Sequence, residues 1–538
     1  MKNKSITVCT VLVENSPQAL PLGAACIASS IKTLSSDFID LKVNLVDFNL
    51  EQKLSVEKIT NDLLCYDSAI YCFSIFVWNK ELLSEVAKNL KKTDCICIAG
   101  GPEVTANPKS FLDFDFVISG EGEIVTKNLI KRILNNDLPA EKIFYGKRES
   151  LENLTSPYLD KTLNPKKYDG ALWELARGCP FKCSYCYESK GDKKVEYFSL
   201  DRIKKELDIF VENDIKQIFV LDPTYNVDKN RAVEIINYIH KHAKNIFFHF
   251  ECRAEFLNVE LVKSFSKINC SLQIGLQSAS EEVLKTVNRS FNKKDFIKKI
   301  SILNDYGIIF GFDLIYGLPK DNYEGFKNSI DFAISLYPNH IEMFCLSVLP
   351  GTSLYDDANK LNLKYNTHPP YHVIESDTFS KVEIEKSRKI SIACNLFYSQ
   401  GRAVPWFNSL MYLLKMKPSN FFEKFVLYLE NKKLLDKEFC NHKEIEKLQI
   451  DFINQILSER NLCKYFNLIK DIIMLNGTLT RSYTDGESSE LSLSYHPDDL
   501  MSEYSQDLKF FLSNAQKFSC KVLVKNNSIK FVNKGNNC

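Results

Sequence analysis

The sequence of 538 residues predicts an α/β protein in which two parallel-sheet domains are followed by a mainly helical region. Short β-branched segments alternate with amphipathic segments over residues 1–136, and the alternation resumes near residue 172. Such alternation is typical of parallel sheets with helices on their faces. From about residue 361 the apolar residues take helical spacing. The predicted division is 1–137, a polar linker at 138–170, 171–360 and 361–538.

The composition is that of a folded globular protein, with 45% hydrophobic and 25% charged residues. The net charge of +1 gives no overall field that would attract polyanions, so we expect no nucleic-acid partner. No segment approaches the roughly 18 consecutive apolar residues of a membrane span. The apolar run at 6–13 lacks a cleavage site behind it, which favours a buried first strand over a signal peptide. We therefore expect a cytoplasmic protein, in which closely spaced cysteines indicate a metal centre.

The first domain is predicted to be Rossmann-like, of the flavodoxin-like type, because its strands are joined by crossover helices. Cys95 and Cys97 lie at period 2 in one expected strand, which favours packing over metal binding. The expected strands are residues 6–13, 43–48, 68–74, 95–99 and 114–119, and the expected helices are residues 22–32, 56–64, 80–90 and 124–134.

The second domain is predicted to be an open, partial (βα)6 barrel of the TIM type, since six units fall short of the eight that close a full barrel. An open barrel leaves one side free for a large substrate or a neighbouring domain. The expected strands are residues 172–176, 217–221, 246–251, 271–275, 309–315 and 340–347, and the expected helices are residues 200–212, 229–242, 259–266, 281–287, 293–305 and 324–336.

The region after residue 361 is rich in aromatic side chains, and its tail at 521–532 is expected to form a short β-hairpin. Aromatic residues at helical spacing are more often core than pocket wall, although a substrate pocket is the alternative. The residues in question are Trp406, Phe407, Tyr412 and Phe422.

Three cysteines spaced C-x₃-C-x₂-C form the most informative motif. Cys179, Cys183 and Cys186 follow directly on the first expected barrel strand, at the end where βα loops build active sites. Three thiolates can hold a [4Fe–4S] cluster and leave one iron open to another ligand. Zinc is the alternative, but zinc prefers paired cysteine knuckles that close a four-coordinate site, and no histidine lies nearby in sequence.

This loop resembles the signature of the radical S-adenosylmethionine (SAM) enzymes, C-x₃-C-x-aromatic-C, with Tyr185 at the aromatic position. The resemblance implies that SAM chelates the open iron and that one-electron reduction yields a 5′-deoxyadenosyl radical, which abstracts hydrogen from a substrate. It also implies that Tyr185 lies near the adenine of SAM.

Other strand ends of the second domain agree with the pattern of that family. The resemblance implies SAM contacts at Asp222 after the second strand, Arg253 after the third, Gln277 after the fourth and Ile315 in the fifth. For Arg253 and Glu255, an exposed charge at the rim of the barrel is an equally favoured interpretation. Cys252 is a candidate thiol, although simple packing is favoured.

The strand ends of the first domain resemble the cobalamin-binding domain that precedes the barrel in many radical SAM proteins. The glycines among them permit close backbone approach and positive φ, and a helix N-terminus can hold polar groups. The residues that carry the resemblance are Pro21, Leu22, Gly23, Ser74, Trp78, Gly100, Gly101, Glu103, Gly120, Glu121, Gly122 and Glu123.

The first domain departs from some cobalamin-binding domains because it has no histidine. All eight histidines lie at His240 or later, so this domain cannot ligate cobalt from below. A cobalt without a histidine on its lower face fits a cofactor that passes repeatedly through cob(I)alamin. The lack of a histidine equally fits a domain that has lost cobalamin.

The expected function is that of a cobalamin-dependent radical SAM enzyme that methylates an unactivated carbon, with a [4Fe–4S] cluster, SAM and cobalamin as cofactors. A cyclisation, ring rearrangement or redox reaction without methyl transfer is the alternative, and a non-catalytic sensor is a third. The expected partners are a small-molecule or peptide substrate and an electron donor such as flavodoxin or ferredoxin. No catalytic residue is assigned by the sequence.

Overall fold

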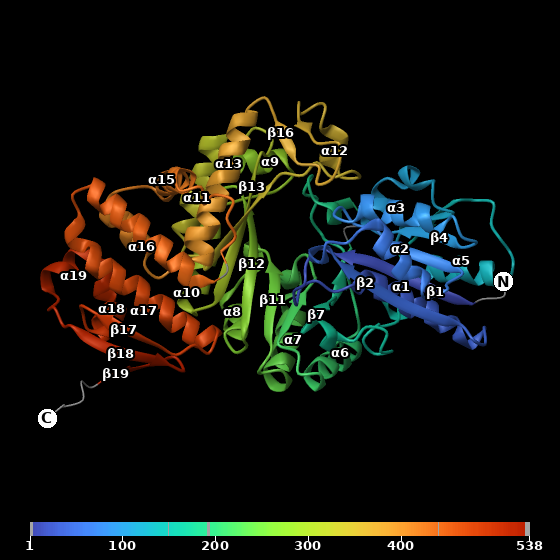
Figure 1. Cartoon of the computed structure of the whole chain (residues 1–538), viewed down its shortest axis with the longest axis horizontal. Coiled ribbons are helices and arrows are strands. Elements are labelled where there is room, and N and C mark those ends of the chain that lie inside the picture. The colour runs from blue at the N-terminus through green and yellow to red at the C-terminus, as the bar shows by residue number, and fades with distance from the viewer. Residues whose placement is uncertain (1–3, 149, 191–193, 440, 533–538) are drawn as a thin grey trace.

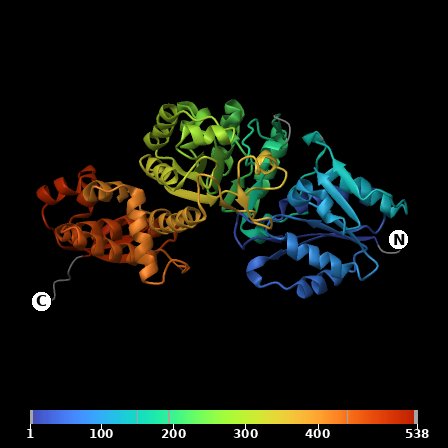
Figure 2. The ribbon, with the colours of Figure 1, turned by 90° about the horizontal axis from the view of Figure 1, so that it is seen from above.

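The computed structural model describes residues 4–148, 150–190, 194–439 and 441–532. The N-terminal domain, the barrel and the helical region follow one another along the longest axis of the molecule (Figure 1), and the view from above shows the same order (Figure 2). No helix in the described ranges is long and apolar enough to cross a membrane.

The N-terminal domain is a parallel sheet of six strands in the order β2-β1-β3-β4-β5-β6. Every residue of β1 is buried, which confirms a core strand at the start of the chain. One apolar core packs α2 and α3 against one face, and another packs α1 and α5 against the other. The elements are β1 (Ser5–Leu12), α1 (Leu22–Lys32), β2 (Lys42–Asn49), α2 (Val56–Leu64), β3 (Ile70–Ser74), α3 (Lys80–Leu90), β4 (Ile96–Gly100), α4 (Pro102–Ala106), β5 (Phe116–Gly120), α5 (Glu123–Leu134) and β6 (Ile143–Gly146).

Strand β6 lies within residues 138–170, which the sequence predicted to be a linker. It pairs with β5 from Val117↔Ile143 to Gly120↔Gly146 and so extends the sheet by one strand. Four residues without buried side chains give no clear period-2 signal, and this explains why five strands were expected.

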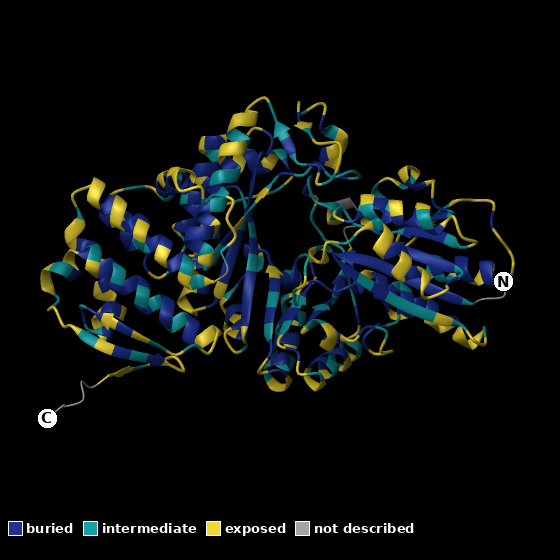
Figure 3. Cartoon of the chain, in the orientation of Figure 1, coloured by how far each residue is buried: buried dark blue, intermediate teal, exposed yellow. Residues whose placement is uncertain are grey.

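The barrel is a second parallel sheet of six strands in the order β14-β13-β12-β11-β10-β7, which leaves β7 and β14 at open edges. Most strand residues are buried or half-buried, with a few exposed positions on β11, β13 and β14, and most exposed residues lie on the surrounding helices and loops (Figure 3). The elements are β7 (Gly170–Trp173), α6 (Leu200–Glu212), β10 (Gln217–Val220), α7 (Lys229–His242), β11 (Phe247–Cys252), α8 (Val259–Phe265), β12 (Cys270–Gln277), α9 (Glu281–Thr286), α10 (Lys293–Asp305), β13 (Ile309–Tyr316), α11 (Tyr323–Ile334) and β14 (His340–Cys345).

The six barrel helices begin at polar residues whose side chains accept a hydrogen bond from the first turn. These N-cap residues are Ser199, Asp228, Asn258, Ser280, Asn292 and Asn322.

The first barrel strand is shorter than predicted. The sequence placed it at 172–176, but β7 ends at Trp173, and Ala176–Arg177 (β8) pairs instead with Glu196–Tyr197 (β9) as an antiparallel ribbon. This ribbon closes the base of the cysteine loop, residues 178–187.

The helical region continues the hydrophobic core of the barrel, so the division at residue 361 stays a prediction. Trp406, Phe407 and Phe422 are buried in this core, as favoured, whereas Tyr412 is exposed. The predicted hairpin is confirmed by β18 and β19, which join β17 in an antiparallel sheet. The elements are α12 (Ser353–Asp357), β15 (Lys364–Tyr365), β16 (Val373–Glu375), α13 (Lys381–Cys394), α14 (Phe407–Leu414), α15 (Pro418–Asn431), α16 (His442–Glu459), α17 (Phe466–Thr484), β17 (Ser489–Leu493), α18 (Pro497–Met501), α19 (Leu508–Asn514), β18 (Cys520–Lys525) and β19 (Ser528–Phe531).

Candidate active site

The cysteine loop starts from a backbone conformation that only glycine adopts easily. Gly178 has φ of +94°, and a Cβ at this position would lie 2.7 Å from the carbonyl oxygen of Lys194. Further along the loop, the amide of Ser184 donates to Val287 O at 3.0 Å, and Ser184 O accepts from the amide of Leu354 at 2.9 Å. The middle of the loop is therefore hydrogen-bonded to Val287, directly after α9, and to Leu354.

The three cysteines of the loop lie at the boundary between core and solvent, with Cys183 buried and Cys179 and Cys186 half-buried. Burial raises the pKa of Cys179 and raises that of Cys186 to about 11. Such thiols stay protonated until a metal draws them into the thiolate form. Within the described residues, no three His, Cys, Asp or Glu side chains are gathered closely enough to hold a single metal ion.

Arg289 is a cation beside the cysteines that the sequence did not indicate. Its Nη1 atom lies 3.9 Å from Cys183 Sγ, and its Nη2 atom donates to Gly275 O. A Cβ at Gly275 would lie 3.3 Å from Nη2 and 2.6 Å from Gln277 Nε2. The glycine two residues before Gln277, at the end of a barrel strand, is the sequence signal that could have revealed this close approach.

Tyr185, Gln277 and Ile315, three of the five residues predicted to contact SAM, line one cavity of about 550 Å³ together with Asp313. The Oε1 atom of Gln277 is buried and has no hydrogen-bond partner in the described part of the chain. Burial raises the pKa of Tyr185, so its hydroxyl stays neutral. The cavity thus offers an unused acceptor beside an aromatic ring.

Asp222 and Arg253, the other two predicted SAM contacts, lie outside this cavity and support the cysteine loop. Asp222 Oδ1 accepts the amides of Leu175 at 2.9 Å and Ala176 at 3.0 Å, and burial raises the pKa of Asp222 to about 7. The guanidinium of Arg253 lies 3.9 Å from the ring centroid of Phe181, within the loop.

The alternative of an exposed rim charge is wrong for Arg253, which is buried and pairs with Glu255, whereas the Glu255 side chain is 41% exposed. Contact of Asp222 and Arg253 with SAM stays a prediction. Cys252 is buried in the barrel core, which confirms the packing interpretation.

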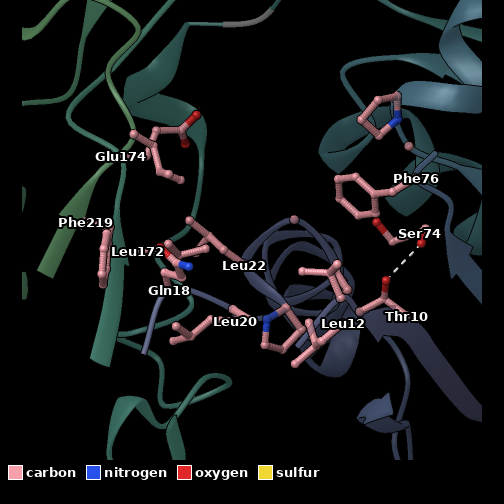
Figure 4. A pocket seen from close by; sticks show the side chains of 18 of the residues that line it. Thr10, Leu12, Gln18, Leu20, Leu22, Ser74, Phe76, Leu172, Glu174 and Phe219 are labelled. Atoms are coloured by element: carbon pink, nitrogen blue, oxygen red, sulfur yellow. Dashed lines mark hydrogen bonds between the residues drawn. The ribbon is translucent and has the colours of Figure 1, made fainter. Parts of the chain in front are cut away.

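A cavity of about 1390 Å³ lies between the strand ends of the N-terminal sheet and the barrel. Figure 4 shows side chains from both domains facing it, with Leu172, Glu174 and Phe219 of the barrel across from Thr10, Ser74 and Phe76 of the N-terminal domain. Of the twelve residues predicted to contact cobalamin, the following line this cavity: Pro21, Leu22, Gly23, Ser74, Trp78, Gly100, Gly101, Gly120, Gly122 and Glu123.

Glu103 and Glu121, also predicted to contact cobalamin, are not among the residues that line this cavity. Glu103 is buried, with Oε2 3.0 Å from Lys80 Nζ and 2.8 Å from the hydroxyl of Tyr371. Glu121 pairs with Arg177, at 3.4 Å. Carboxylates at a poorly hydrated interface are held by the nearest cations, and this accounts for both positions.

Arg177 ties the N-terminal domain to the start of the cysteine loop. Its Nη2 atom lies 2.7 Å from Glu123 Oε1 and its Nε atom 2.9 Å from Glu174 Oε1. Tyr187, at the end of the loop, donates from its hydroxyl to Pro102 O at 3.2 Å. The loop that carries the cysteines is thus anchored to two of the glycine-containing loops of the first domain.

The inner side of the barrel adds polar side chains that the sequence analysis did not propose. They project into the large cavity from β11, β12 and β14, and their period-2 spacing along each strand is the signal that could have found them. These residues are His249, Glu251, Ser271, Gln273, His340 and Glu342.

Comparison with known proteins assigns families to two parts of the chain. Residues 173–333 match the model of the radical SAM superfamily. Residues 359–491 match a family described as a protein of unknown function, DUF4080.

Two curated relatives are methyltransferases by name. The chain is 24% identical over 406 residues to an uncharacterized methyltransferase of Pyrococcus horikoshii, a match that covers 68% of this chain and 85% of that protein. It is 26% identical over 326 residues to the cobalamin-dependent radical SAM methyltransferase TokK of Streptomyces tokunonensis, covering 53% of this chain and 48% of TokK. The match therefore spans about half the length of TokK.

Two solved structures share the fold. The cobalamin-dependent SAM radical enzyme OxsB with aqua-cobalamin bound matches with a TM-score of 0.60 and 15% identity, over 96% of this chain and 85% of that chain. The methyltransferase TsrM from Kitasatospora setae with cobalamin and a [4Fe–4S] cluster bound matches with a TM-score of 0.54 and 14% identity, over 72% of this chain and 81% of that chain. These matches confirm the predicted fold class, a Rossmann-like domain, a partial barrel and a helical region.

Proposed function

Because the chain belongs to the radical SAM enzymes that carry a cobalamin-binding domain ahead of the barrel, we propose that it transfers a methyl group from SAM to an unactivated carbon of a small-molecule or peptide substrate. One observation supports this most. A cavity of about 1390 Å³, lined by strand ends of the N-terminal sheet and by the inner side of the barrel, adjoins the smaller cavity beside the cysteine loop, because Gln273 of the larger cavity donates to Asp313 of the smaller one. Two cofactors and a carbon atom that react together must lie close to one another.

The cysteine loop fits a [4Fe–4S] cluster held by Cys179, Cys183 and Cys186. The cluster would draw these thiols into the thiolate form, and Arg289, 3.9 Å from Cys183 Sγ, would partly balance the negative charge. The aromatic contact between Arg253 and Phe181 keeps the loop in place. When bound, the cluster supplies the electron that cleaves SAM, and cobalamin supplies a carrier for the methyl group.

The cavity beside the loop fits SAM. Gln277 Oε1 has no hydrogen-bond partner in the described chain and would accept a hydrogen bond from a hydroxyl or amino group of SAM. Tyr185 and Ile315 would form walls for the adenine, and Asp313 in the same cavity would accept a ribose hydroxyl. The cation of Arg289 would pair with the SAM carboxylate.

The N-terminal side of the large cavity fits cobalamin. Gly101, which lines this cavity, has φ of +108°, and a Cβ there would lie 2.6 Å from Ile75 O, so this loop needs glycine to pack against the backbone that follows β3. The Ser74 hydroxyl faces the cavity with no hydrogen-bond partner in the described chain, and the Nε1 atom of Trp78 donates to Val11 O at 2.8 Å. No histidine of this domain is available to ligate cobalt.

The test is anaerobic reconstitution with iron, sulfide and cobalamin, followed by reduction in the presence of SAM. Wild-type protein should bind about four iron atoms and form 5′-deoxyadenosine together with S-adenosylhomocysteine. The variant Cys179→Ala/Cys183→Ala/Cys186→Ala should lose iron and both products, whereas Cys463→Ala, on an exposed cysteine far along the chain, should keep them. Robust 5′-deoxyadenosine formation without S-adenosylhomocysteine would contradict methyl transfer and favour a rearrangement or redox reaction.

A further inference from the structure

The barrel end of the large cavity has a polar floor formed by one row of side chains across neighbouring strands. Strand pairing places Glu251 of β11 opposite Gln273 of β12, Gln273 opposite Gly311 of β13, and Gly311 opposite His340 of β14. Glu342 lies two residues beyond His340 on the same face of β14. Residues far apart in the chain are thereby gathered on the floor of one cavity.

A hydrogen-bonded chain fixes the middle of this floor. His340 Nε2 donates to Gln273 Oε1 at 2.7 Å, and Gln273 Nε2 donates to Asp313 Oδ1. A Cβ at Gly311 would lie 2.1 Å from His340 Nε2, so glycine leaves the space that the imidazole occupies. Burial lowers the pKa of His340, and the ring is therefore neutral at neutral pH.

The two carboxylates on the floor are not compensated by the protein. Neither Glu251 nor Glu342 has a hydrogen bond or an ion pair in the part of the chain that the structure describes. Arg177 is the one Lys or Arg side chain among the described residues that line the cavity, and it pairs with Glu121, Glu123 and Glu174.

Among the neighbouring ionisable groups, the positive charge of Arg289 acts on Asp313, but Arg289 forms no ion pair with Glu251 or Glu342 in the described chain. His249 is neutral because burial and His340 lower its pKa to about 4. Burial and the neighbouring Asp313, Glu342 and Glu188 carboxylates raise the pKa of Glu251 to about 7. The raised pKa shows that a negative charge on the floor is unfavourable unless a cation accompanies it.

A separate observation indicates that the same cavity is built for a ligand. The side chain of Ser74, on the N-terminal side, is nine-tenths buried, and its hydroxyl faces the cavity with no hydrogen-bond partner in the described chain (Figure 4). The hydroxyl is thus accessible from the cavity and can form a hydrogen bond with a ligand there.

We propose that Glu251 and Glu342 bind a positively charged amine or guanidine group of the substrate and so hold its reacting carbon between the two cofactor sites. The inference rests on the proposed function, because it places the substrate in the cavity assigned to catalysis. A cation would supply the charge that the floor lacks, whereas an anionic substrate would meet repulsion from both carboxylates.

The test measures binding rather than turnover, so that its failure is distinct from failure of the proposed function. Three probes of similar shape are titrated into the reconstituted full-length protein with SAM present: phenethylamine, 3-phenylpropan-1-ol and 3-phenylpropionate. The amine should bind at least tenfold more tightly than either other probe. This preference should vanish in Glu251→Gln/Glu342→Gln, fall in Glu251→Gln alone, and persist in Glu260→Gln, whose carboxylate is exposed on α8.

The variants must keep the wild-type circular dichroism spectrum. If the double variant does not fold, the fall in amine preference is measured with Glu251→Gln alone. Equal binding of all three probes would overturn the inference, as would preference for the anion or no detectable amine binding at millimolar concentration. Displacement of the amine by SAM would also overturn it, because the carboxylates would then belong to the SAM site.

Discussion

The hydroxyl of Tyr371 donates to Glu103 Oε2 at 2.8 Å and joins residues that are 268 positions apart in the sequence. Lys80 completes the contact, with Nζ 2.9 Å from the Tyr371 hydroxyl and 3.0 Å from Glu103 Oε2. Glu103 lies in α4, directly after Gly100 and Gly101, and Tyr371 lies between β15 and β16, beyond the last barrel strand. This triad therefore fixes a glycine loop of the first domain against the β15–β16 segment that follows the barrel.

Removing the phenol hydroxyl from this triad should weaken the interface. We expect Tyr371→Phe to lower the free energy of unfolding by about 1–2 kcal/mol, because Glu103 loses a buried hydrogen bond but keeps Lys80. Urea unfolding followed by tryptophan fluorescence measures the change. Tyr483→Phe, at a tyrosine with 71% exposure, is the control, and equal effects of the two variants would show that the triad adds no stability.

The close approach of His340 to Gly311 predicts a steric conflict. Gly311→Ala should destabilise the barrel by about 1–3 kcal/mol, because the new Cβ would displace the imidazole and break its bond to Gln273. In a His340→Ala background the same substitution should cost far less. Unfolding of the two single variants and the double variant gives the coupling energy, and simple additivity would argue against this geometry.

The buried carboxyl of Asp222 predicts how stability depends on pH. Its pKa is raised in the folded protein from 3.8 to about 7, so folding favours the protonated form and stability falls as pH rises from about 4 to 7. Asp222→Asn keeps an acceptor for the amides of Leu175 and Ala176 without ionising. The variant should gain stability relative to wild type across this range, by on the order of 4 kcal/mol at most. Parallel pH profiles of the two proteins would disprove the raised pKa.

The position of Arg289 predicts a selective loss of SAM affinity. Arg289→Gln should weaken SAM binding by roughly tenfold or more, since a hydrogen bond to a charged group contributes about 1.5–3 kcal/mol. Iron content should stay near the wild-type value, because the cysteines remain. Equilibrium dialysis with labelled SAM measures the affinity, with Arg388→Gln, at an exposed ion pair with Glu385, as the control. Loss of iron together with SAM would instead indicate a role in holding the cluster.

Local sequence signals predicted the regular elements well. Helices α2, α6, α7 and α10 have the predicted bounds, because polar N-caps and amphipathic spacing mark them independently of the rest of the chain. Strand β6 was missed because a short edge strand with half-buried side chains lacks such a signal.

The candidate site was only partly predictable, for a physical reason. Contiguous motifs led to the cysteine loop and to the glycine loops, since each depends on neighbouring residues. Glu251, Gln273 and His340 meet only through strand register, and Glu103 reaches Tyr371 only through domain packing. Such contacts depend on the three-dimensional arrangement, which spacing along one segment does not encode.

Isotope labelling distinguishes methyl transfer coupled to SAM cleavage at these two adjoining cavities from SAM cleavage alone. The reconstituted, reduced protein is incubated with SAM carrying a trideuterated methyl group and with metabolite and peptide extracts, and products are analysed by mass spectrometry. We expect a product heavier than its substrate by about 17 Da, formed in step with 5′-deoxyadenosine and S-adenosylhomocysteine. Sustained formation of 5′-deoxyadenosine with a converted substrate that carries no deuterated methyl group would contradict it.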